Sequence, residues 1–136
     1  MMPAKTEPAI DPNPADVFRS IIRMWETGDL SQFDRLVSAD YVGHVAAGER
    51  DREGLRERIL AFRQSYPAMH FDVQEQLASG DRVASRMVAT GTDAEGRSVA
   101  LMGLNMSRIK DGKIEEEWNT WEAMQTPPAA QKPLAE

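Results

Sequence analysis

The spacing of apolar residues changes near the middle of the chain, from a helical period to a period of two. Before Pro67, apolar side chains recur at steps of three and four, as they do along one face of a helix. After Pro67 they alternate with polar side chains, as they do in a strand with one buried face. The change predicts helices followed by an antiparallel meander, and therefore an α+β fold with the helices on one face of a curved sheet.

The first part of the chain carries the signals of three helices. Residues 13–16 combine a capping asparagine, a proline and an acid, the order typical of a helix start, and Gly28 is typical of a helix end. A short second helix is predicted within residues 30–37. Asp51 is expected to cap a third helix, which Pro67 closes. The apolar stripe of this third helix falls at steps of four, three and four: Leu55, Ile59, Phe62 and Tyr66.

Alternating apolar and polar residues predict the strands. Residues 41–45 are expected to be extended, and the other predicted strands follow the third helix. Those later strands cover residues 69–74, 82–92, 98–109 and 113–122.

Length and composition indicate one soluble domain. A chain of 136 residues can bury a core without cross-links, and zero cysteines exclude a disulfide framework or a thiolate metal site. The net charge of −6, with Lys and Arg scattered, argues against a nucleic-acid partner. No apolar run approaches the roughly 20 residues of a membrane span, and no signal peptide is evident, so the expected location is the cytoplasm. The domain is expected at residues 13–124, between disordered tails at 1–12 and 125–136.

The last predicted hairpin, residues 107–121, turns at Asp111-Gly112, a strong signal for antiparallel pairing. Its loop holds either two residues or three, and the choice decides which side chains share a face. The three-residue loop pairs Ile109 with Lys113 and yields two coherent faces, so we prefer it. The even-numbered face is then apolar, with Met102, Leu104, Met106, Ile114 and Trp118. The odd-numbered face holds Gly103, Asn105, Ser107, Glu115, Glu117, Asn119 and Trp121.

Four segments follow one another in an order and spacing that resemble a known family. They are Trp25-Glu-Thr-Gly-Asp29, Ala39-Asp-Tyr-Val-Gly-His44, Gly80-Asp-Arg-Val83 and Arg108-Ile-Lys-Asp-Gly-Lys-Ile-Glu-Glu-Glu-Trp118. On these segments the span from Phe18 to Trp121 resembles the SnoaL-like polyketide cyclases and "ester cyclases" of the nuclear transport factor 2-like superfamily. Each segment alone is a weak signal, but together they cover nearly the whole expected domain.

The resemblance implies a cone-shaped α+β barrel, in which three N-terminal helices and a curved, mainly antiparallel sheet enclose an apolar pocket. It also implies that enzyme members use no metal or organic cofactor. In relatives that close a ring by aldol chemistry, a histidine on the penultimate strand and an aspartate on the last strand face the pocket. Counted from the shared Asp-Gly-Lys turn, these positions are Asn105 and Asn119 here. Asparagine takes up no proton near neutral pH, so this acid-base pair is expected to be lost.

Glu117 is the first candidate for a catalytic acid or base. It lies on the predicted odd-numbered face, where the preferred register places it opposite Asn105, and apolar walls would raise the pKa of its carboxyl group. The alternative is that Glu115, Glu116 and Glu117 form a solvated acidic run paired with cations such as Arg86.

His44 is the second catalytic candidate, because the resemblance places it at the pocket mouth and histidine titrates near neutrality. A structural histidine bonded to a backbone carbonyl is the alternative, and two histidines without ligand spacing predict no metal site. Trp25, Tyr41 and Trp121 are candidates for contact with a flat ligand, although buried aromatic residues more often belong to the core. Glu122 is expected to cap its strand or to rim the pocket.

An apolar even-numbered face and a pocket on the odd-numbered face are compatible if a second subunit covers Met102, Leu104, Met106 and Trp118. We therefore predict a homodimer through the sheet. The leading functional hypothesis is a cofactor-independent cyclase-type or isomerase-type enzyme that acts by proton transfer on a small hydrophobic, polyketide-like carbonyl compound. The alternatives are a non-catalytic dimer that binds a small molecule, and a structural dimer whose own side chains fill the cavity.

Overall fold

The computed structural model describes residues 13–125, which form three helices and six strands. In chain order these are α1 (Pro14–Thr27), α2 (Phe33–Leu36), β1 (Val37–Val45), β2 (Gly48–Arg50), α3 (Arg52–Ser65), β3 (Ala68–Ser79), β4 (Arg82–Thr92), β5 (Ser98–Lys110) and β6 (Lys113–Ala123). The tails expected at residues 1–12 and 125–136 lie outside the described residues, apart from residue 125.

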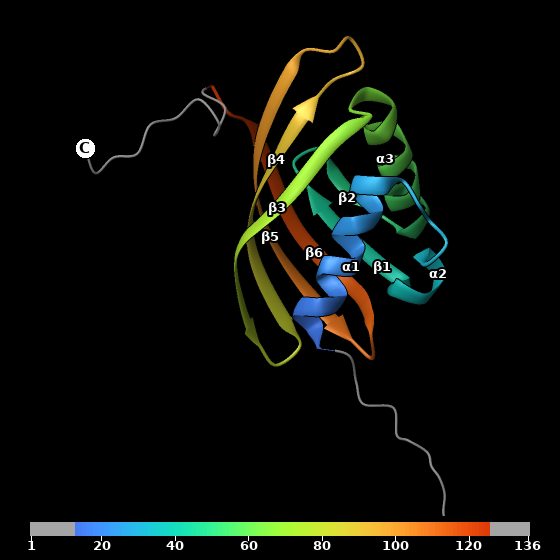
Figure 1. Cartoon of the computed structure of the whole chain (residues 1–136). Coiled ribbons are helices and arrows are strands. Elements are labelled where there is room, and N and C mark those ends of the chain that lie inside the picture. The colour runs from blue at the N-terminus through green and yellow to red at the C-terminus, as the bar shows by residue number, and fades with distance from the viewer. Residues whose placement is uncertain (1–12, 126–136) are drawn as a thin grey trace, which may run out of the picture.

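The described strands form a mixed sheet in the order β2-β1-β6-β5-β4-β3. Neighbouring strands are antiparallel except for β1 and β6, which are parallel. The sheet curls without closing, and the helices lie on one side of it (Figure 1). The predicted α+β fold is confirmed, and the short strand β2 is an addition to it.

Local signals in the sequence explain where α1 begins and ends. The side chain of Asn13 accepts a hydrogen bond of 2.8 Å from the backbone N–H of Ala15, and Pro14 occupies the first turn. Gly28 ends the helix in the left-handed conformation, and its N–H bonds to the carbonyl of Met24. The apolar face that results is buried against the sheet and α3: Val17, Phe18, Ile21, Ile22 and Met24.

Helix α3 begins at the predicted cap. The carboxylate of Asp51 accepts a hydrogen bond of 2.8 Å from the backbone N–H of Gly54. Leu55 and Ile59 are fully buried, and α3 packs against α1 and β1. No helix within residues 13–125 is both long enough and apolar enough to cross a membrane.

The turn between β5 and β6 is shorter than the three-residue loop that we preferred from the sequence. Asp111 (φ 55°) and Gly112 (φ 76°) form a two-residue turn, and Lys110 pairs with Lys113 on either side of it. Positive φ at both central residues is the geometry that Asp-Gly favours in a tight hairpin. The predicted three-residue loop is therefore wrong.

A β-bulge follows the turn directly. Ile109 pairs with Ile114, whereas Arg108 pairs with Glu116, so Glu115 is an extra residue without a partner across the ladder. The side chain of Glu115 accepts a hydrogen bond from Arg108, on the even-numbered face, rather than joining the odd-numbered face as predicted.

The bulge restores the predicted faces for the rest of the hairpin, with a shifted register. Asn105 pairs with Asn119 and Ser107 pairs with Glu117, so the predicted direct pairing of Glu117 with Asn105 is wrong. Ile114 is fully buried and belongs with the inward-facing residues, which also differs from the prediction. Beyond the bulge, odd-numbered residues point toward the helices because the two-residue turn and the extra residue together preserve parity.

Replacing Ile59 by alanine should lower the free energy of unfolding by about 2–5 kcal/mol, because the buried side chain leaves a cavity between α3 and its neighbours. The control Leu60→Ala removes a side chain that is 48% exposed and should cost less than about 1 kcal/mol. Urea unfolding followed by tryptophan fluorescence measures both values. Equal losses from the two variants would contradict this packing.

Candidate functional site

A cavity of about 420 Å³ lies between the helices and the inner face of the sheet; we call it the inner cavity. Side chains of α1 and α3 line one side, and inward-facing residues of β5 and β6 line the other. A volume in this range is typical of small-molecule sites. The lining is mostly apolar, with a few polar groups from the sheet and one arginine from α3.

Aromatic rings form a continuous wall of the inner cavity. Trp25 of α1 meets Phe62 of α3 edge to face, with ring centroids 5.7 Å apart. Phe62 also contacts Tyr66 at 5.0 Å and Phe71 of β3 at 5.6 Å. Phe71 in turn meets Trp121 of β6 edge to face at 5.8 Å. Such a wall presents flat apolar surfaces against which a planar ligand can stack.

Gly103 makes room for the last ring of this wall. It pairs with Trp121 across β5 and β6, and a Cβ atom at position 103 would stand 2.6 Å from the indole ring. Any side chain at this position would displace Trp121. The shape of the inner cavity therefore depends on a glycine that lies beside it.

A buried carboxylate is the main ionisable group of the inner cavity. Glu117 is 5% exposed; its Oε2 accepts a hydrogen bond from the Tyr41 hydroxyl, and its Oε1 accepts one of 2.7 Å from the Asn105 amide. The side-chain oxygen Oδ1 of Asn105 accepts a hydrogen bond of 2.6 Å from the Ser107 hydroxyl, and this bond orients the amide. Each carboxylate oxygen of Glu117 thus accepts one hydrogen bond and can accept a second one. Hydrogen bonds, rather than an ion pair with a described residue, offset the cost of burying the charge.

The position of the Tyr41 hydroxyl depends on a second glycine. Gly43 follows Tyr41 by two residues on the same face of β1 and pairs with Glu117 of β6. A Cβ atom at position 43 would overlap the Tyr41 hydroxyl, so glycine is required for the phenol to reach the carboxylate. The segment from Ala39 to His44, distinctive in the sequence, therefore forms one side of the hydrogen-bonded polar cluster of Tyr41, Asn105, Ser107 and Glu117.

Burial raises the pKa of the Tyr41 phenol well above its ordinary value of 10.0, and the negative charge of Glu117 raises this pKa further. The guanidinium of Arg58, on α3, acts in the opposite direction. The phenol consequently stays protonated near neutral pH and acts as a hydrogen-bond donor to Glu117.

Most of the predicted site residues lie together. The inner cavity is lined by Trp25, Asn105, Glu117, Asn119 and Trp121. Tyr41 is fully buried and contacts this group through Glu117. These residues come from α1, β1, β5 and β6, so the curl of the sheet brings them to one place.

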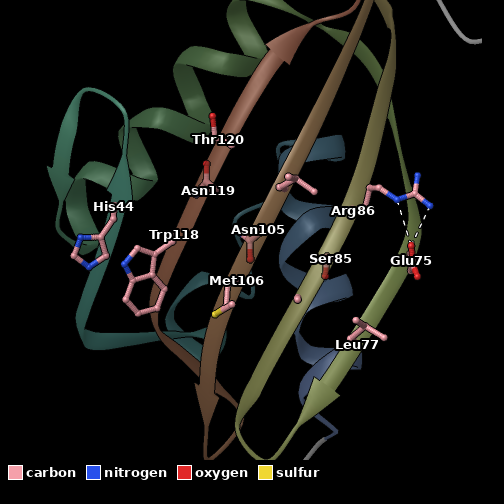
Figure 2. Close-up of a pocket in the computed structure, with 12 residues that line it drawn as sticks. His44, Glu75, Leu77, Ser85, Arg86, Asn105, Met106, Trp118, Asn119 and Thr120 are labelled. Atoms are coloured by element: carbon pink, nitrogen blue, oxygen red, sulfur yellow. Dashed lines mark hydrogen bonds and ion pairs between the residues drawn. The ribbon is translucent and has the colours of Figure 1, made fainter.

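His44 lies on the opposite, outer face of the sheet. There it lines a groove of about 590 Å³, and its ring stacks on Trp118 with centroids 5.0 Å apart and 11° between the planes (Figure 2). Its Nε2 is 2.8 Å from a carboxylate oxygen of Glu116. This hydrogen bond and a second one from Arg108 lower the pKa of the Glu116 carboxyl group. Glu122 pairs with Met102 on the same outer face and is exposed.

Several residues of the inner cavity are not among the predicted site residues: Arg58, Phe62, Tyr66 and Phe71. The apolar stripe of the third helix predicts Phe62 and Tyr66 as core. Arg58 lies three residues after Leu55 and four before Phe62, so it shares their face of α3. An arginine inside an apolar stripe was the signal in the sequence that could have identified it.

Within the described part of the chain, no three His, Asp or Glu side chains gather closely enough to hold a metal ion. That the reaction needs no cofactor stays a prediction.

Comparison with known proteins supports the resemblance seen in the sequence. A sequence model of the SnoaL-like polyketide cyclase family matches residues 15–128. The chain has no match among the curated proteins.

Solved structures of similar fold include IdmH, a candidate polyketide cyclase from Streptomyces antibioticus. It is 31% identical, with 82% of this chain and 93% of IdmH aligned and a TM-score of 0.74. A loop-truncated variant of IdmH is 33% identical, with 81% and 93% aligned and the same TM-score of 0.74. AclR, a candidate hydroxylase from Streptomyces galilaeus, is 20% identical, with 85% and 89% aligned and a TM-score of 0.72, which shows a shared fold alone.

The buried phenol leads to a pH prediction. In a Tyr66→Phe background Tyr41 is the remaining tyrosine, and absorbance at 295 nm should not rise between about pH 9 and 11 while the protein stays folded. Because the folded pKa of Tyr41 lies above the unfolded value, its stabilising effect is complete below about pH 10 and is lost as pH rises further. The stability advantage of Tyr66→Phe over Tyr41→Phe/Tyr66→Phe should therefore shrink above that pH. Ionisation of the folded protein near pH 10 would argue against this environment.

Proposed function

Since the chain belongs to the SnoaL-like polyketide cyclase family, we propose that it binds a small, flat, hydrophobic carbonyl compound in the inner cavity and transfers a proton on it, as a cyclase-type or isomerase-type enzyme. The observation that carries the proposal is Glu117, a carboxylate that is 5% exposed and lines an otherwise mostly apolar cavity. The aromatic wall from Trp25 to Trp121 supplies surfaces for the flat body of the ligand.

In the proposed reaction, Glu117 removes a proton from the carbon next to the carbonyl group, and the electron pair of the broken C–H bond moves into the carbonyl to form an enolate. The Glu117 carboxyl then returns this proton, either to another carbon in an isomerisation or to the alkoxide oxygen left when the enolate carbon bonds to a second carbonyl in a ring closure. Tyr41 and Asn105 each donate a hydrogen bond to one carboxylate oxygen of Glu117, and these two bonds orient the carboxylate. In this proposal the amide of Asn119, which also lines the cavity, donates a hydrogen bond to a ligand oxygen other than the one that becomes negative.

His44 and Glu122 have no role in the proposed proton transfer. Both lie on the outer face, on the far side of the sheet from Glu117. The chemistry rests on Glu117, because the positions at which the resemblance implies an acid-base pair are Asn105 and Asn119.

A second candidate function is binding without chemistry. The specific observation in its favour is that Asn105 and Asn119, paired across β5 and β6, both carry amides that do not titrate near neutral pH. In this case the inner cavity holds a ligand and Glu117 is a hydrogen-bond acceptor for it.

We also propose that the protein is a homodimer through the outer face of the sheet. The large apolar side chains Met102, Leu104, Met106 and Trp118 are 37–52% exposed there, on neighbouring strands. Contiguous exposed apolar surface of this kind is typical of interfaces, and a second copy of the same face would cover it.

The proton-transfer step can be measured without knowing the natural substrate. Aromatic ketones such as 2-tetralone should exchange their α-protons for deuterium in D₂O when the protein is present, detected by mass spectrometry. Glu117→Gln should slow this exchange by about 100-fold or more, since general acid-base catalysis commonly contributes ~10²–10⁴-fold.

The matched control is Glu116→Gln, which changes the neighbouring carboxylate on the outer face and should leave the exchange rate unchanged. Thermal-shift measurements verify that both variants remain folded. Exchange that survives Glu117→Gln would reject the role of Glu117. Ligands that stabilise the wild-type protein without any exchange would instead favour the binding function.

Light scattering at micromolar concentration should report twice the mass of one chain. Met106→Lys combined with Leu104→Lys should convert the dimer to a monomer, because a buried unpaired lysine is costly at an interface. The control Leu60→Lys, at an exposed position of α3, should remain dimeric. A wild-type protein that is a uniform monomer under these conditions would overturn the dimer.

A further inference from the structure

Arg58 is a cation in the inner cavity that forms no ion pair with a carboxylate of residues 13–125. It lies on α3 and lines the cavity opposite the sheet, and its guanidinium carbon is 5.3 Å from the centroid of the Trp25 ring. Its Nη1 is shielded from solvent and has no hydrogen-bond partner among the described residues. Such a donor is costly to leave unsatisfied.

Two other arginines of α3 differ in this respect. Arg52 and Arg56 both form ion pairs with Asp34 near the surface. Arg58 forms no ion pair with any carboxylate of residues 13–125 at the distance of 4.0 Å that defines one. The charge of its guanidinium and a hydrogen-bonding interaction with the phenol both lower the pKa of Tyr41, so the guanidinium lies close to the Tyr41–Glu117 pair, although no ion pair joins Arg58 and Glu117.

We propose that Arg58 is an oxyanion-binding group of the inner cavity and that the natural ligand carries an acidic oxygen on its flat apolar body. This inference rests on the proposed function, in that the inner cavity is taken as the ligand site. A planar guanidinium with several N–H groups matches a carboxylate or enolate better than any other side chain does. The Trp25 ring beside it favours a position of the guanidinium at the cavity wall, where an entering oxygen supplies the missing acceptor.

The location of the charges also fixes the orientation of the ligand. Arg58 comes from α3, whereas Glu117 comes from β6. An anionic oxygen is drawn to Arg58 and repelled by the carboxylate of Glu117, so the oxygen points to the helix. The carbon that loses a proton then faces the sheet.

Two sources of the oxyanion share this chemistry. It is either a carboxylate that the ligand carries from the start, or an enolate oxygen that becomes negative when Glu117 removes a proton. The first affects equilibrium binding, and the second affects the rate of proton exchange without affecting the binding of the neutral ketone.

The test compares two probes of the same shape, 2-naphthoate and the neutral 2-naphthamide, by titration calorimetry. With a ground-state carboxylate site, the wild-type protein should prefer the naphthoate by about tenfold to a hundredfold, the range expected for a charge-assisted hydrogen bond. Arg58→Gln should remove this preference and leave the binding of naphthamide within about twofold. Arg56→Gln, two residues away on α3, is the matched control and should preserve the preference.

An enolate site predicts a different result. The two naphthyl probes then bind the wild-type protein equally, while Arg58→Gln slows α-proton exchange of 2-tetralone by about tenfold or more without changing its dissociation constant. Arg58→Lys keeps the charge and should retain part of whichever effect is observed.

Equal binding of the two probes together with an unchanged exchange rate in Arg58→Gln would overturn the proposal. So would the same losses in Arg56→Gln. If Arg58→Gln does not fold, the preference of the wild-type protein and the behaviour of Arg58→Lys still decide the question. Failure of the proposed proton transfer is a separate result: Glu117→Gln then has no effect on exchange, whereas the charge preference at Arg58 is measured at equilibrium.

Discussion

The bulge at Glu115 is the constraint on which the rest of the site depends. The Asp111-Gly112 turn alone would set β6 in a register that points Glu116 and Trp118 toward the helices and Glu117 toward solvent. One extra residue reverses that outcome and sends Glu117 inward. The carboxylate that remains outside, Glu116, pairs with His44 and Arg108 instead. Two neighbouring glutamates thus acquire opposite environments through a single residue of backbone.

Once Glu117 is inside, its surroundings follow from the need to satisfy a buried charge. Tyr41 donates to one oxygen and Asn105 to the other, and Gly43 keeps the space above β1 open for the phenol. These donors hold the carboxylate in one orientation, with capacity left for a ligand. The same rigidity that stabilises the charge would position it for proton transfer. A carboxylate that accepts two hydrogen bonds is a weaker base, but its orientation is fixed. A fixed orientation favours proton transfer when the base must face one particular carbon of the ligand.

The two faces of the sheet differ in chemical character. The inner face, covered by α1 and α3, encloses the aromatic wall and the polar cluster. The outer face carries exposed apolar side chains around Trp118 and His44 (Figure 2). On the inner face, Asn105 and Asn119 stand at the positions where the resemblance implies a histidine and an aspartate. Their amides can donate and accept hydrogen bonds but do not titrate near neutral pH.

The sequence by itself determined the order of the helices and of the strands other than β2, and the caps at Asn13 and Asp51. These features depend on residues close together in the chain, where side-chain period and local hydrogen bonds act directly. Only the tertiary structure decided the register of the hairpin, the hydrogen bond between Tyr41 and Glu117 across 76 positions, and the entry of Arg58 into the cavity. The outward position of His44 follows from this hydrogen bond, because side chains alternate along β1 and Tyr41 points inward to Glu117. Such contacts join segments far apart in sequence, and a shift of one residue in backbone pairing changes all of them, so no local pattern specifies them.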